Sequence, residues 1–129
     1  MSPMKVKKLF TPAEANKTLP LVKRIVRDIL ERGKEMRALV EGEHRSVEQD
    51  SRIHELEGEV QELMGELEEV GCYYKDWGFE MGLVDFPAQV DGEIVFLCWR
   101  SDEDQVTWYH GIEAGYRGRK RIPVALLKS

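Results

Sequence analysis

Residues 83–100 read Leu-Val-Asp-Phe-Pro-Ala-Gln-Val-Asp-Gly-Glu-Ile-Val-Phe-Leu-Cys-Trp-Arg, and this stretch decides the fold of the C-terminal half of the chain. The Asp91-Gly92 pair at its centre is typical of a two-residue type I′ turn, because both central residues of that turn need a positive φ. The flanking residues are rich in the β-branched and aromatic types that strands favour. The stretch therefore predicts an antiparallel hairpin with strands at 83–90 and 93–100.

The two-residue turn also determines which residues face one another across this hairpin. On one face the expected pairs are apolar, with Val84 opposite Trp99, Phe86 opposite Leu97 and Ala88 opposite Val95. The other face pairs Asp85 with Cys98, Leu83 with Arg100 and Pro87 with Phe96. We expect the apolar face to pack on helices and the polar face to carry any site.

A third strand is expected at residues 105–110, after the polar turn 101–104, and a short strand at residues 72–74. A four-residue second turn adds Thr107 and Tyr109 to the polar face. The same register puts His110 on the apolar face, beside Val95 and Trp108. A change of one residue in that turn would reverse this placement.

The N-terminal half begins with an amphipathic segment that starts at Thr11-Pro12-Ala13-Glu14. This is a capping box with proline at the first helical position. Apolar residues then recur every three or four positions as far as Gly42. Pro20 predicts a kink or a restart, because proline lacks an N–H and crowds the preceding turn. Gly33 either allows the close approach of a neighbour or weakens the helix by about 1 kcal/mol.

A second segment carries a coiled-coil-like seam that ends at Gly71. Its apolar residues are Ile53, Leu56, Val60, Leu63, Leu67 and Val70. The polar residues 41–46 can turn the chain, so an antiparallel helical hairpin is expected over 11–71. We predict a single α+β domain over 1–129, in which this hairpin packs on a small antiparallel β-meander at 72–129 that ends in a basic loop.

Charge is unevenly distributed along this chain of 129 residues, whose formal net charge is −5. Lysine and arginine outnumber the acidic residues in 1–40, whereas glutamates dominate 41–70. Two arms of opposite charge can neutralise each other in a hairpin. This arrangement, together with a pI of about 5.3, argues against nucleic-acid binding.

Location follows from hydropathy and cysteine content. No apolar run approaches the roughly 18 residues that a membrane-spanning helix needs, and no signal-type stretch follows the N-terminus. Cys72 and Cys98 are too few for a disulfide framework or a four-cysteine zinc site, so we interpret both as reduced thiols. We expect a cytoplasmic protein that does not enter a membrane.

Two kinds of chemistry can be drawn from the C-terminal half. His110, Glu113 and Asp85 could ligate a divalent metal as a cofactor, although mixed ligands without a second nearby histidine are a weak signature. A nucleophilic Cys98 would need His110 as its base. Because the expected register separates these two residues onto opposite faces, it favours a buried, inert thiol.

The loop after the third strand is glycine-rich and basic. Its cations are Arg117, Arg119, Lys120 and Arg121, with Tyr109 and Tyr116 nearby. Such a cluster can bind a phosphate or a nucleic-acid single strand by charge and stacking. It can also pair with the glutamate-rich helix or with the acidic turn 102–104, and we expect this pairing.

The hairpin also bears on assembly. A helix of roughly 22 residues spans about 33 Å, so the hairpin should extend beyond strands of about 20 Å. Gly58 and Gly65 lie together on the second helix, away from the seam, where small residues suit close contact with another element. That element could be the sheet or a second copy of the hairpin, and we expect a homodimer.

Several motifs together resemble a bacterial family catalogued as domain of unknown function family 2203. They are Phe10–Asn16 with Leu19-Pro20, Lys75-Asp76, Gly82–Ala88, Leu97–Arg100, Trp108–His110 and Gly115–Arg119. Ser101-Asp102-Glu103 departs from the Gly-Glu turn usual in the family. The resemblance implies a small cytoplasmic bacterial protein and supplies no activity or catalytic assignment.

The leading hypothesis is a non-enzymatic binding or assembly module whose polar sheet face holds a small anion or a peptide. Arg100 and Arg119 would bind the anion, with Arg117 as a further candidate. Asp85 would orient Arg100, and His110 would contribute a hydrogen bond. The alternatives are a metal-dependent or acid/base enzyme using His110, Glu113 and Asp85, and nucleic-acid binding by the basic arm and loop.

Overall fold

The computed structural model describes residues 6–42 and 45–128, which form two long helices and a five-stranded antiparallel sheet. The helices are α1 (Pro12–Val40) and α2 (Val47–Val70). The strands are β1 (Tyr73–Tyr74), β2 (Leu83–Val90), β3 (Glu93–Arg100), β4 (Trp108–Gly111) and β5 (Lys120–Arg121), and they neighbour one another in that order. The α+β class and the meander are confirmed, whereas β5 was not expected.

Helix α1 begins with the expected capping box, in which Thr11 and Glu14 each accept a hydrogen bond from the other's backbone N–H. Of the kink or restart expected near Pro20, the restart is wrong, because α1 is one continuous helix through this residue, and the kink stays a prediction. The side chain of Pro20 points to solvent, while the residues on either side of it along the apolar stripe, Leu19 and Val22, are buried. Burial of this stripe therefore keeps the helix continuous.

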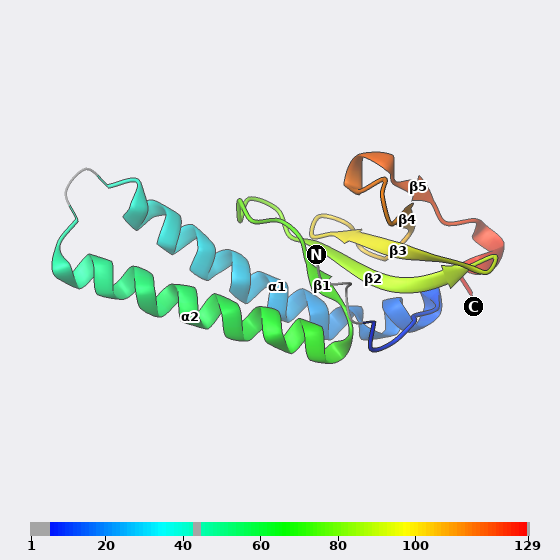
Figure 1. The fold of residues 1–129 in the computed structure, drawn as a ribbon, viewed down its shortest axis with the longest axis horizontal. Helices are drawn as coiled ribbons and strands as arrows, with labels where there is room; N and C mark the ends of the chain where they lie inside the picture. Colours follow the sequence, from blue (N-terminus) through cyan, green and yellow to red (C-terminus); the bar gives the residue numbers. More distant parts are fainter. Residues whose placement is uncertain (1–5, 43–44, 129) are drawn as a thin grey trace.

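The two helices form the expected hairpin, and their shared end projects well beyond the sheet (Figure 1). Helix α2 ends at Gly71, whose φ of 112° is the left-handed conformation of a helix C-cap. Ion pairs cross the hairpin from Arg32 to Glu59 and from Arg52 to Glu35. In the first pair the cation lies on α1 and the carboxylate on α2, as expected. In the second pair the cation lies on α2 and the carboxylate on α1. None of the helices in the described ranges is long and apolar enough to cross a membrane.

The core lies between α1 and the inner face of the sheet. The residues of the first β-hairpin pair as predicted, so Val84, Phe86 and Trp99 face inward and are fully buried. They pack with Val22 and Val26 of α1 in one hydrophobic cluster. The apolar half of the register prediction is therefore confirmed.

Glycines at close contacts show how tightly the loop before β2 packs on α1. A Cβ atom added at Gly33 would lie 2.3 Å from the Phe79 ring, and one added at Gly82 would lie 2.3 Å from Cγ1 of Val26. Gly33 therefore allows the close approach of a neighbour. Gly58 and Gly65, in contrast, have no atom of the described residues within 4 Å of an added Cβ apart from their own stretch of helix, so the sheet does not cover them.

The register between β3 and β4 differs from the prediction by one residue. Phe96 lies opposite His110 and Cys98 opposite Trp108, so His110 is on the outer, polar face of the sheet. Tyr109 packs against the core instead. The placement of His110 on the apolar face is therefore wrong, as is its separation from Cys98.

Tertiary contacts explain this difference. The connection occupies residues 101–107, because the amide oxygen and nitrogen of Asn16 on α1 bond the backbone N–H and C=O of Val106. Trp99 Nε1 also donates to the carbonyl oxygen of Glu103. These contacts hold the connection as a loop, and β4 begins only at Trp108.

Candidate functional site

Three buried polar side chains meet on the outer face of the sheet. Asp85 comes from β2, Cys98 from β3 and His110 from β4, with exposed fractions of 5%, 1% and 4%. Their candidate ligand atoms all lie within 4.8 Å of one another. Three adjacent strands thus place a carboxylate, a thiol and an imidazole together, and we call these residues the Asp85–Cys98–His110 cluster.

The imidazole of His110 is held at both ring nitrogens. Nδ1 lies 2.8 Å from the carbonyl oxygen of Gly111, which can only accept, so Nδ1 carries a proton and donates it. Nε2 lies 3.1 Å from Oδ1 of Asp85. The hydrogen bond to Asp85, followed by that to Cys98, raises the pKa of His110 to about 10 against the opposing effect of burial. A positive charge is therefore favoured between these groups.

This arrangement does not form a nucleophilic relay. In a Cys–His–Asp relay, the sulfur and the carboxylate occupy opposite ring nitrogens of the histidine. Here the nitrogen that does not face Asp85 donates to a backbone carbonyl. Cys98 and His110 are neighbours, contrary to expectation, but the geometry does not favour a catalytic thiolate.

A cavity of about 310 Å³ opens above the cluster. Besides the three cluster residues, it is lined by Lys75, Leu83, Ile112, Gly115 and Tyr116. Lys75 follows β1 at the start of the loop to β2, and within the described ranges no hydrogen bond or ion pair engages its ammonium group. The cavity thus has a polar floor, apolar walls and an unpaired cation.

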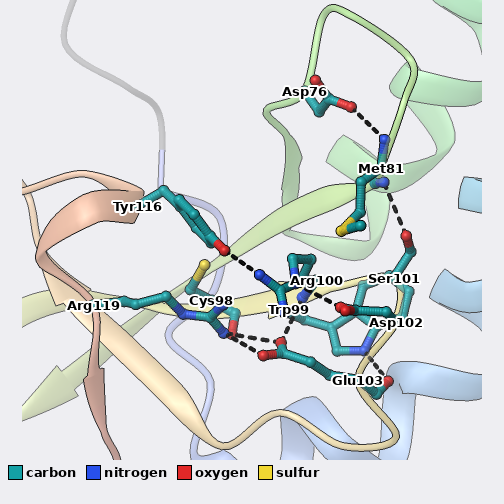
Figure 2. A network of polar contacts seen from close by, with 11 residues as sticks. Asp76, Met81, Cys98, Trp99, Arg100, Ser101, Asp102, Glu103, Tyr116 and Arg119 are labelled. Atoms are coloured by element: carbon teal, nitrogen blue, oxygen red, sulfur yellow. Dashed lines mark hydrogen bonds and ion pairs between the residues drawn. The ribbon is translucent and has the colours of Figure 1, made fainter.

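Arg100 does not contact Asp85. Its guanidinium donates to the carboxylate of Asp102 and to the hydroxyl of Tyr116, as Figure 2 shows. Asp102, followed by Tyr116, raises the pKa of Arg100. The expectation that Asp85 orients Arg100 is therefore wrong, and Arg100 instead positions Tyr116 at the cavity.

Arg119 lies beside the same wall and is held by Glu103, from which its Nη2 is 2.8 and 2.9 Å away (Figure 2). The side chains of Arg119 and Glu103 are only 10% and 15% exposed. The guanidinium also stacks on Trp108 and Tyr116, with centroid distances of 4.6 and 5.0 Å. Glu103 in turn accepts from the backbone N–H of Arg100. Arg119 thereby ties the loop after β4 to the turn after β3.

The remaining candidates lie outside the cavity. Glu113 and Arg117 are exposed in the loop after β4, and neither lines the cavity. The expected metal ligands were His110, Glu113 and Asp85. In the structure the third donor beside Asp85 and His110 is Cys98, which was expected to be inert, and not Glu113. The other thiol, Cys72, lies in the core, where burial raises its pKa to about 12. The correct β3–β4 register would have identified Cys98 as a member of the cluster, because it places Cys98 and His110 on the same face of the sheet.

Comparison with known proteins yields one match. A family model described as "Uncharacterized conserved protein (DUF2203)" matches residues 8–122. Searches of curated proteins and of solved structures each found no match. The matched segment contains both helices, all five strands and every residue that lines the cavity. The chain therefore belongs to the DUF2203 family, as its motifs had suggested.

Proposed function

We propose that this protein is a binding module that holds a small organic anion, such as a carboxylate, in the cavity on the outer face of its sheet. The single observation that carries this proposal is Lys75, an exposed residue whose ammonium group has no partner within the described ranges, in the lining of a cavity with a buried polar floor. Small-ligand sites commonly combine apolar walls with a few placed polar groups.

The ligand's charge and size follow from the lining. Arg100 and Arg119 already have carboxylate partners, so they are less available to a ligand than Lys75 is. Leu83 and Ile112 offer apolar contacts to a carbon skeleton. A cavity of about 310 Å³ is at the lower end of the roughly 300–1,000 Å³ range of small-molecule sites, which favours a small acid over a nucleotide or a peptide.

Binding is measured by calorimetry with a panel of acetate, propionate, malonate, succinate, benzoate and inorganic phosphate, on protein that has been freed of metal with a chelator and then dialysed to remove the chelator. Lys75→Gln should lower the affinity for the best carboxylate about tenfold or more, because a charge-assisted hydrogen bond is lost. The matched control is Lys120→Gln, an exposed lysine on β5. Equal affinities for the two variants, or no binding from the whole panel, would overturn the proposal.

Nucleic-acid binding by the basic loop has no comparable support. Arg119 is paired and largely buried, and Arg121 stacks on Trp108 at 4.9 Å and donates to the hydroxyl of Thr107. These cations hold the loop on the sheet. We keep the homodimer through the hairpin and the cytoplasmic location as proposals that rest on the sequence.

A further inference from the structure

We infer that the Asp85–Cys98–His110 cluster is a binding site for a divalent transition metal of the zinc class, with its open coordination position directed into the cavity. This inference concerns the floor of the proposed anion site. It does not require that the anion be bound, so the two proposals can fail separately.

The donor set carries the first step. A thiolate, an imidazole and a carboxylate are the three ligand types that zinc accepts, whereas magnesium and calcium prefer oxygen ligands alone. All three donors are within 4.8 Å of one another and at most 5% exposed. A thiolate and a carboxylate together balance the charge of a divalent ion, which is required where charges are buried.

The spacing fits as well. Two ligands bound at about 2.0–2.1 Å to a tetrahedral zinc ion lie roughly 3.3–3.4 Å apart. His110 Nε2 and Asp85 Oδ1 are 3.1 Å apart, so a shift of a few tenths of an ångström replaces their hydrogen bond with two metal bonds. The sheet therefore holds the His110–Asp85 pair close to the geometry that a metal needs, and the sulfur of Cys98, within 4.8 Å of both, would have to approach by up to about 1.2 Å.

The hydrogen bond from His110 Nδ1 to Gly111 is the second independent feature. Metal-bound histidines almost always donate their other ring N–H to a carbonyl or a carboxylate, which fixes the tautomer and the ring orientation. The bond to the Gly111 carbonyl does this and leaves Nε2 to face Asp85. A histidine with this outer contact is oriented as a ligand.

The position of the cavity defines the kind of site. Structural zinc sites have four protein ligands, whereas sites that bind substrate have three and keep one position open. Within the described chain the cluster has three such residues, and the same three line the cavity. The open position would be taken by water or by one oxygen of the small anion, whose other end reaches Lys75.

The test begins with wild-type protein that is made without a histidine tag and treated with a chelator. Cobalt(II) is titrated in a non-coordinating buffer without organic anions, and a thiolate-to-cobalt charge-transfer band should appear. Zinc should bind at about one ion per chain and displace the cobalt. Absence of the band together with no calorimetric zinc binding would overturn the site.

Variants assign the ligands. Cys98→Ser should abolish the charge-transfer band. His110→Gln and Asp85→Asn should each lower the zinc affinity. Loss of a residue that only contacts a ligand costs roughly 10–100-fold, so loss of a ligand should cost more than this. Cys72→Ser is the matched control, because Cys72 is the other buried free cysteine, and it should keep the band. A band that survives Cys98→Ser but not Cys72→Ser would contradict the assignment.

A measurement on wild-type protein makes the test independent of variant stability. X-ray absorption of the zinc-loaded protein should show one sulfur ligand, with nitrogen and oxygen ligands making up the rest. A first shell without sulfur would overturn the site. Zinc binding with no affinity for any anion would reject the proposed function and keep the metal site. Anion binding by the metal-free protein, with no zinc binding, would reject the metal site and keep the proposed function.

Discussion

Nε2 of His110 on β4 lies 3.1 Å from Oδ1 of Asp85 on β2, so the two side chains meet above the strand β3 that separates them. Strands separated by one neighbour are about 9.6 Å apart, twice the usual strand spacing. On β3, Cys98 lies opposite Asp85 and Phe96 lies opposite His110, so the contact crosses β3 diagonally. The small side chain of Cys98 leaves room for the imidazole to reach the carboxylate.

Loss of the carboxylate in this pair should destabilise the protein. Asp85→Asn removes the partner of a buried histidine, and breaking a buried pair costs about 3–5 kcal/mol in the free energy of unfolding. Asp102→Asn, at an exposed ion pair with Arg100, should have a much smaller effect, because solvent and salt screen exposed charges. Denaturant unfolding of chelator-treated protein measures both. Equal losses would contradict a special role for the buried pair.

The raised pKa of His110 predicts how the stability of the metal-free protein depends on pH. The pKa rises from 6.5 to about 10 on folding, so the protonated imidazole is bound more favourably in the folded state. The resulting stabilisation is fully present below about pH 6.5 and is lost as the pH rises through 10. Nitrogen NMR of the His110 ring should show a protonated imidazole at pH 8. A midpoint near 6.5 would contradict this.

The Glu103–Arg119 pair should stabilise the loop that forms the cavity wall. Glu103→Gln weakens a charge-assisted contact to a largely buried guanidinium, and should cost about 1.5–3 kcal/mol in the free energy of unfolding. Glu113→Gln, in the exposed part of the same loop, should change stability by no more than about 0.5 kcal/mol. Thermal unfolding compares the two variants, and a neutral Glu103→Gln would show that the pair does not hold the loop.

Two helix glycines should respond in opposite ways to alanine. Gly33→Ala forces a Cβ into the ring of Phe79 and should cost about 1–3 kcal/mol. Gly58→Ala places its Cβ in open space beside the helix. It should raise the free energy of unfolding by about 0.5–1 kcal/mol at low protein concentration, because alanine is more favourable than glycine inside a helix. Similar effects at both positions in denaturant unfolding would contradict the close contact.

The homodimer expected from the sequence can be tested on the open face of α2. The wild-type protein should have twice the mass of the chain of 14.9 kDa in light scattering. Gly65→Arg puts a long cation where no described atom lies within 4 Å of an added Cβ, so it should give a folded monomer. A monomeric wild type would reject the dimer, and a dimeric variant would move the interface to another face.

Local chemistry was enough to predict most elements. Thr11 and Glu14 cap α1 through their own side chains, Gly71 ends α2 through its positive φ, and Asp91-Gly92 sets the β2–β3 register through a two-residue turn. Each of these signals acts over four residues or fewer, so it does not depend on the rest of the fold. The pairing of Asp85 with Cys98 followed from the same reasoning.

The position of His110 was decided by contacts between distant parts of the chain. The side chain of Asn16 holds Val106 from 90 residues away, and Arg119 holds Glu103 from 16 residues away. Because strand side chains alternate, a shift of one residue in the β3–β4 register moves His110 from the core face to the polar face. Sequence alone therefore predicted the two halves of the fold and the pairing of Asp85 with Cys98. Tertiary packing brought the imidazole of His110 to this carboxylate and thiol.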